Sequence, residues 1–346
     1  MDASTQSWTD RLMAVWYKLM PGESGSVRSR AVGVALLIVL IALLALSFWW
    51  SREPAPFWVE WENAGQPAVR GHATTRALIG VTSTLLDKPG GYLTNDVMPP
   101  GVALDNIPSW EWGVLKQSRD LVKSLRNDYS RSQTQSIEDP DLTLAEPRLN
   151  HNRHSWILPP AESQYRQAIT HLENYLARLG DPNDRDAQFY ARADNLRSWL
   201  EQVEKRLGNM AQQLSASVGQ RRVNTDLAGD PSAETATPRP TDVDVRTGWF
   251  EIDDVFFEAR GTAWALVHFL RAAEYDFAQV LTDKNATVSL RQVIRELEAS
   301  LAPIRSPIIL NGSGYGMTAN HSLVMSSYLS SANAAVIELR DLLSKG

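Results

Sequence analysis

The chain has 346 residues, of which 43% are hydrophobic, so it can bury a substantial core and lacks the composition of a disordered protein. Its formal net charge of -6 argues against a general nucleic-acid-binding protein, because such a protein needs a basic face. The absence of cysteine excludes disulfides, thiolate metal ligands and cysteine nucleophiles.

Residues 1–30 are expected to form a cytoplasmic tail. Within this tail, the segment Ser7 to Gly22 carries apolar residues at helical spacing and stops at Pro21 and Gly22. Such a segment can form an amphipathic helix in the inner headgroup layer, or it can remain a tail without regular structure. The sequence leaves both interpretations open.

The segment Ala31–Trp50 contains twenty residues without a charge, enough for a helix of about 30 Å that spans the hydrocarbon core of a bilayer. Arg28 and Arg30 precede it, while Trp49 and Trp50 close it with side chains that favour the headgroup zone. The positive residues predict a cytoplasmic N-terminus, with everything after Trp50 outside the inner face. A cleaved signal peptide is the alternative, although the leader and the apolar core are long for one.

Residues 51–219 follow a helical period, which predicts an all-α helical bundle with antiparallel helical hairpins. The clearest stretch runs from Phe189 to Leu214 in steps of four and three residues, and Tyr165 to Leu179 repeats the pattern. Because the turn at residues 180–186 is short, we expect these two helices to pair as an antiparallel hairpin. The same coiled-coil pattern would alternatively support a homo-oligomer.

Three further helices are expected in a C-terminal helical subdomain, residues 249–346. Residues 220–248 are polar and contain three prolines, so we predict a linker or loop without regular structure between the two subdomains. Nearer the apolar segment, Ala68–Gly91 and Pro108–Ser130 each predict a helix, the second with Ser109 as its N-cap.

Three groups of residues could form a catalytic or binding site, and for each of them a structural role is the favoured interpretation. Gly312, Gly314 and Gly316 alternate strictly and lack the Lys and Ser/Thr of a phosphate loop, so they predict a turn before a helix capped by Asn320 or Thr318. His151 and His154 lie in a loop without further ligands nearby. The acidic residues Glu251, Asp253 and Asp254 suit a helix N-terminus. We therefore predict no metal, cofactor, nucleotide or catalytic residue.

The segment Asp87–Gly113 is a long irregular stretch whose glycines and prolines predict an ordered loop. Long ordered loops often bind a partner, although this one could instead be a structural loop packed on the bundle. The residues expected to contact a partner are Tyr92, Asn95, Asp96, Asp105, Trp110 and Trp112.

The same stretch, "PGGYLTNDVMPPGVALDNIPSWEWGVL", resembles the signature segment of an uncharacterised family of proteobacterial membrane proteins, a domain-of-unknown-function family. The resemblance extends over most of the chain. It implies a single-pass protein of the bacterial inner membrane with a periplasmic main domain, and it implies no activity and no site residues.

Two functions remain open from the sequence. The first is a non-enzymatic scaffold or interaction protein of the cell envelope, with the lipid bilayer and an envelope protein as partners and no nucleic acid. The alternative is an envelope hydrolase or lyase that acts on cell-wall polymers through paired carboxylates such as Asp96, Asp105 or Glu251.

Overall fold

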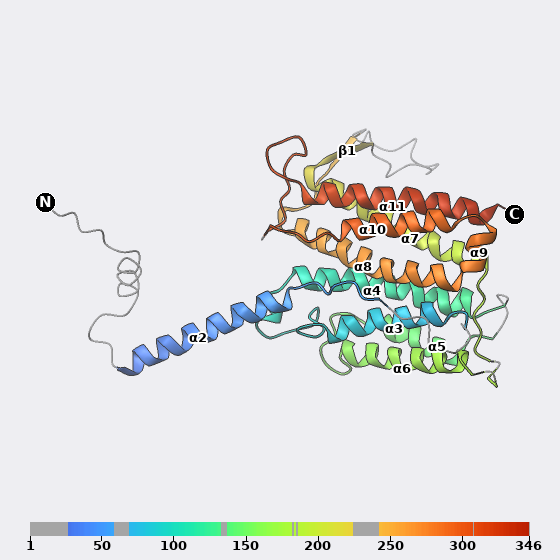
Figure 1. Cartoon of the computed structure of the whole chain (residues 1–346). Coiled ribbons are helices and arrows are strands. Elements are labelled where there is room, and N and C mark those ends of the chain that lie inside the picture. The colour runs from blue at the N-terminus through green and yellow to red at the C-terminus, as the bar shows by residue number, and fades with distance from the viewer. Residues whose placement is uncertain are drawn as a thin grey trace, which may run out of the picture. The chain divides into compact units, whose positions relative to one another are not determined.

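The computed structural model describes residues 27–58, 69–132, 137–181, 183–184, 186–223, 242–306 and 308–345. Residues 1–50 and 51–346 are two separate compact units. The structure is mostly helical, as the sequence predicts, and it is drawn in Figure 1. The expected amphipathic segment at residues 7–22 lies outside the described residues.

The first unit is represented by one helix, α2 (Val27–Trp50). Its stretch Arg30–Trp50 is 21 residues long and apolar enough to cross a membrane, and none of it is buried in protein. Trp49 lies exposed at its end. A membrane anchor and a signal sequence both satisfy these observations.

The second unit is a helical bundle built around the pair α4 (Asn106–Ser124) and α8 (Ile252–Asp276). The two helices approach closely because Gly113 faces the backbone of Glu258, while Gly261 faces the backbone of Trp110. Trp110 and Trp264 fill the space beside this crossing, with ring centroids 5.1 Å apart. A five-residue π-helix, η2 (Leu125–Tyr129), continues α4.

Two groups of helices flank this pair (Figure 1). On one side lie α3 (His72–Asp87), α5 (Pro140–Leu149) and α6 (Ala161–Leu179). On the other lie α7 (Ala193–Ser215), α10 (Thr287–Ser300) and α11 (His321–Ser344), with the short α9 (Ala278–Asp283) between α8 and α10. Among the described residues, the short 3-10 helices are η1 (Gly101–Ala103), η3 (Ala216–Val218) and η5 (Trp249–Glu251).

The predicted hairpin between residues 165–179 and 189–214 is wrong. Helix α6 packs against α5 and α3, whereas α7 packs mainly against α11. The connection redirects the chain, because Phe189 packs against Tyr129 and Phe277 and the Tyr190 N–H donates to the Tyr129 carbonyl at 2.7 Å. A heptad pattern specifies an apolar stripe, and any apolar helix face can cover it.

Residues 220–248 are also more ordered at their ends than predicted. The strands β1 (Gln220–Val223) and β2 (Asp242–Val245) pair antiparallel, with Gln220 opposite Val245. Residues 224–241 lie outside the described part. Helices from before and after this segment pack together, α4 against α8 and α7 against α11, within one compact unit.

Of the two predicted helix N-caps, one is confirmed and the other is wrong. Asn320 caps α11 as expected, since its side-chain oxygen accepts the Leu323 N–H at 2.8 Å. Ser109 does not cap α4, because the helix begins earlier and Asp105 is its N-cap. The Ser109 hydroxyl instead donates to Asp254 at the start of α8, at 2.7 Å.

Candidate interaction site

The loop of residues 88–105, between α3 and α4, is held in place by the buried carboxylate of Glu111. This carboxylate accepts the backbone N–H groups of Leu93 and Thr94, each at 2.8 Å, and the Thr94 hydroxyl at 2.5 Å. Lys88 Nζ lies 2.5 Å from Glu111 Oε1, and both side chains are fully buried. Lys88 also donates to the Gly91 carbonyl. Since unpaired buried charges are very costly, this pair makes the loop an ordered part of the fold.

A second loop, residues 150–160 between α5 and α6, is tied to the first through Asn95. The Asn95 amide donates to the Ser155 carbonyl and to Glu162 Oε2, both at 2.8 Å. Asp96 lies close to the same glutamate and packs against Gly101. Burial and then repulsion by Glu162 raise the pKa of Asp96, while Lys88 opposes the shift. The two loops therefore form one connected surface.

Of the six predicted contact residues, three are buried. Tyr92 packs edge-on against Tyr165 at 5.5 Å, and burial strongly raises the pKa of its hydroxyl. Asn95 joins the two loops, as described above, and Trp110 lies in the core against Trp264. Asp96 is half-buried, and Asp105 is exposed at the N-terminus of α4.

Trp112 is the one half-exposed aromatic ring among the predicted residues. Three cations surround its indole ring: Arg153 at 4.3 Å, Lys116 at 5.0 Å and Arg119 at 5.4 Å from the ring centroid. Arg119 is fixed by bonds to the carbonyls of Leu149 and His151, both at 2.7 Å. An aromatic face beside fixed cations suits a partner group that is planar or anionic.

The sequence reasoning missed the exposed apolar tips of both loops. Val97, Met98 and Val102 are exposed in the first loop, and Trp156, Ile157 and Leu158 in the second. The prediction favoured polar and aromatic residues of the first loop and did not consider residues 156–160. An apolar run between turn-forming residues, with no helical or strand period around it, was the signal available.

The carboxylates named for a hydrolytic alternative partly converge. Asp254 lies near Glu251 and Asp253 on its own segment and near Asp105 from α4. Burial raises the pKa of Asp254, the Ser109 hydrogen bond opposes this, and the neighbouring acids raise it further. The positive ends of α4 and α8 also accommodate acidic residues here without any catalytic role. His151 and His154 lie in the second loop, where His154 accepts a hydrogen bond from Arg153 at 2.9 Å.

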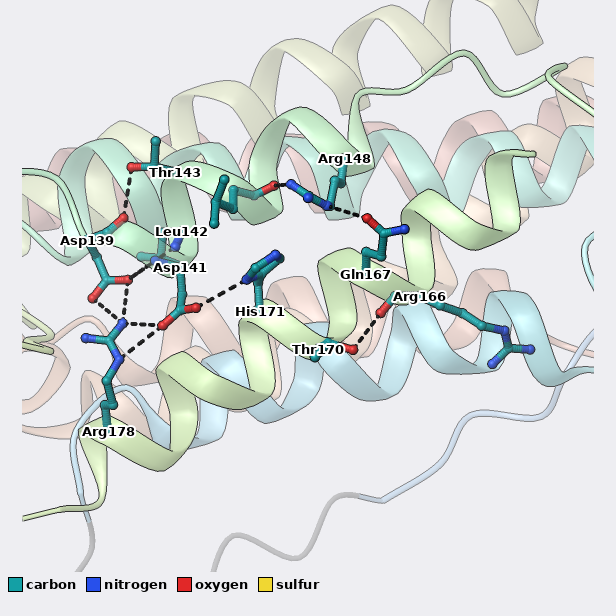
Figure 2. A network of polar contacts seen from close by, with 11 residues as sticks. Asp139, Asp141, Leu142, Thr143, Arg148, Arg166, Gln167, Thr170, His171 and Arg178 are labelled. Carbon is teal, nitrogen blue, oxygen red and sulfur yellow. Dashed lines mark hydrogen bonds and ion pairs between the residues drawn. The ribbon is translucent and has the colours of Figure 1, made fainter. Parts of the chain in front are cut away.

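Figure 2 shows polar contacts along α5 and α6, and the ion pairs of Arg178 lie at the C-terminal end of α6. Arg178 Nη2 lies 2.8 Å from Asp139 and 2.6 Å from Asp141, and His171 Nδ1 lies 3.2 Å from Asp141. Burial works against the charged form of Asp141, but the hydrogen bonds from Arg178 and His171 outweigh it and lower the pKa of this carboxyl. All groups in this network are paired with one another, which indicates that it joins α5 to α6.

Fold and site together define a helical-bundle protein preceded by one apolar helix of membrane-spanning length. The chain belongs to the family described as "Uncharacterized protein conserved in bacteria (DUF2333)", whose model matches residues 23–346. Comparison with curated proteins and with solved structures found no match.

Proposed function

We propose that this protein is a single-pass protein of the bacterial inner membrane whose helical bundle lies in the periplasm and binds an envelope partner without catalysis. The topology is supported by the uncovered apolar helix α2 together with Arg28 and Arg30 at its N-terminal end. The ordered surface around Glu111, which presents Trp112 beside Arg153, supports the binding role.

The rigidity of this surface is the observation that carries the proposal. A loop held by a buried carboxylate and tied to a neighbouring loop loses little conformational entropy when a partner binds. Trp and Arg are also the residue types that contribute most to protein–protein binding energy. We therefore place the partner contact at Trp112, Arg153 and Arg119.

Site-specific photo-cross-linking in intact cells tests the binding role. A photoreactive residue at Trp112 is expected to capture a discrete envelope protein that mass spectrometry identifies. The same residue at Lys205, which is exposed on α7, serves as the control. Equal labelling at the two positions would contradict the assigned surface.

The proposed membrane orientation, with the bundle in the periplasm, has a separate test. A reporter that is active only in the periplasm, fused after Gly346, should be active. A reporter active only in the cytoplasm, fused at the same place, should be silent. The reversed pattern would refute the outward orientation.

A second candidate function is that of a hydrolase or lyase acting on a cell-wall polymer, and the convergence of Asp105, Glu251 and Asp254 favours it. A carboxyl with a raised pKa can act as a general acid while a neighbouring carboxylate stays ionised. Under this alternative, Asp254→Asn would abolish release of wall fragments and leave photo-cross-linking at Trp112 unchanged. Under the binding proposal, the same substitution leaves wall turnover unchanged.

A further inference from the structure

One end of the bundle gathers several loops whose tips are apolar. This end, here called the loop end, is where α3 finishes and where α4, α6, α8 and α11 begin (Figure 1). Side-chain contacts connect its parts: Asn95 to the 150–160 loop at 2.8 Å, and Ser109 to Asp254 at 2.7 Å. The ring of Phe256 near the start of α8 lies 6.3 Å from that of His321 at the start of α11.

Large hydrophobic side chains project into solvent from every loop at this end. Tyr315 and Met317, between α10 and α11, are fully exposed. Phe250, before α8, is 87% exposed and Leu158, before α6, is 89% exposed. Together with Met98 and Trp156 they form the set called here the tip residues. Four separate loops thus expose apolar tips at one end, an arrangement that calls for an apolar or interfacial partner.

The covalent chain limits how far this end can lie from the membrane. Glu53 is bound in the bundle, with its carboxylate accepting from Arg260 Nε at 2.7 Å and Nη2 at 2.7 Å. Arg260 also donates to the carbonyls of Ser300 and Ala302, so this point is fixed. Glu53 follows Trp50, the last residue of α2, by three positions along the chain, which gives a span of at most about 11 Å.

The position of Arg260 on α8 shows which half of this helix is attached to Glu53. Arg260 lies eight residues from the first residue of the helix, a rise of about 12 Å, so it belongs to the half of α8 that carries the loop end. When Trp50 sits at the membrane interface, Arg260 must lie close to the bilayer surface. This attachment brings the loop-end half of α8 within reach of the bilayer surface.

We propose that the loop end rests on the outer leaflet of the membrane that α2 spans, with the tip residues inserted into the headgroup region. The partner is a lipid surface, and the inference depends on the membrane anchor of the proposed function. Trp and Tyr side chains favour this depth because one part of the side chain is apolar and the other carries a polar group, while Phe, Leu and Met add apolar area. The bundle is therefore held at a defined orientation by two contacts, the anchor and the loop end.

The charges at the loop end indicate what drives this contact. The acidic residues Asp105, Glu251 and Asp253 lie at the same end as the tip residues, together with the cation Arg153, so attraction to anionic lipid does not account for binding. Insertion of the apolar tip residues into the headgroup region does account for the binding. We therefore expect the contact to form on zwitterionic lipid and to persist in high salt, where long-range electrostatic attraction is screened.

The absence of cysteine from the native chain allows a direct test with the full-length protein. Single substitutions Tyr315→Cys and Leu158→Cys carry an environment-sensitive fluorophore, and the protein is reconstituted into phosphatidylcholine vesicles containing a headgroup-attached nitroxide quencher. Val288→Cys, exposed at the opposite end of the bundle, is the matched control. Ile41→Cys in α2, read with acyl-chain nitroxides, reports the anchor itself.

We expect quenching at positions 315 and 158 to exceed that at position 288 several-fold, with and without high salt. If position 41 is quenched while positions 315 and 158 behave like position 288, the loop-end contact is refuted and the anchor stands. If position 41 is not quenched, the membrane anchor fails and the proposed function with it. Quenching at the tips that requires anionic lipid or low salt would refute apolar insertion. Unquenched tips that cross-link to a protein in cells would assign this surface to a protein partner instead.

Discussion

Lys88 and Glu111 form an ion pair of 2.5 Å that is fully buried beneath the loop of residues 88–105. The carboxylate also accepts two backbone N–H groups of this loop, so a single side chain of α4 decides the loop's conformation. Burying two charges is costly, and their removal from water is offset here by the pairing and by additional hydrogen bonds.

Replacing Glu111 by Gln should therefore destabilise the protein by about 3–5 kcal/mol, because it leaves the Lys88 ammonium buried without a counter-ion. Thermal unfolding followed by circular dichroism in detergent measures the change. The matched control is Asp87→Asn, which breaks the exposed pair of Asp87 with Arg166 in the same region and should cost less than about 1 kcal/mol. Similar losses for the two variants would contradict the role assigned to Glu111.

The crossing of α4 and α8 makes a second prediction. A methyl group added at Gly113 would clash with the Glu258 carbonyl and the Thr262 backbone nitrogen, so Gly113→Ala should separate the helices and destabilise the protein by about 3 kcal/mol or more. Gly208→Ala on α7 is the control, since its nearest neighbour is the Asn333 amide at 3.5 Å. There, replacing a helical glycine should be neutral or stabilising by up to about 1 kcal/mol. Urea unfolding of both variants measures the two changes in unfolding free energy, and equal changes would contradict the close crossing of α4 and α8.

His268 supplies a prediction on pH dependence. Its Nδ1 donates to the Trp264 carbonyl and its Nε2 accepts the Phe57 N–H at 3.0 Å, so the folded protein needs the neutral ring. Burial lowers the pKa of His268 to about 4, although the hydrogen bonds raise it somewhat. The unfolded chain, with a pKa of 6.5, takes up the proton first as the pH falls. The stability from this group is therefore complete above pH 6.5 and is lost as the pH drops towards 4.

The unfolding free energy should fall by about 3 kcal/mol between pH 6.5 and pH 4. This follows from about 1.4 kcal/mol for each unit of difference between the folded and unfolded pKa. His268→Gln, which can offer a similar donor and acceptor without titrating, provides the comparison. The difference in unfolding free energy between the native protein and this variant, measured against pH, isolates the histidine from the other acids. A difference that does not change with pH would refute a buried neutral His268.

The Arg178 network of Figure 2 gives the last prediction. Asp139 is buried, caps α5 by accepting the Asp141 and Leu142 N–H groups, and is paired with Arg178. Arg178→Ala should cost about 2–4 kcal/mol, because it leaves Asp139 without its counter-ion. The control Lys205→Ala removes an exposed pair with Glu201 four residues away, worth about 0.3–0.5 kcal/mol. Thermal unfolding that shifts equally in both variants would exclude a structural role for the network.

The sequence alone predicts local features well, because periodicity and caps depend on neighbouring residues. The apolar segment closed by Trp50, the helices from α3 to α11 with recognisable seams, and the Asn320 cap all follow from short stretches of chain. Helix α5 was missed because it has ten residues and contains Pro147, which obscures its period. The strands β1 and β2 were missed because each has only four residues, which carry too little pattern.

The choice of partners for each apolar face was decided only by the tertiary structure. The seams of α6 and α7 look complementary in sequence, but the anchoring of Phe189 against Tyr129 and Phe277 sends α7 to α11. Glu111 is one acid among many in the sequence, and only the fold brings the backbone of residues 93 and 94 onto it.

The sequence by itself determined that a helix fit for a bilayer lies near the N-terminus and is followed by a bundle of helices, since both depend on the pattern of apolar residues within single segments. The tertiary structure decided which loops share one end of the bundle, and hence that Tyr315, Phe250 and Leu158 project from one surface. The physical reason is that contacts between residues far apart in the chain depend on how whole helix faces pack, and no local pattern encodes that packing.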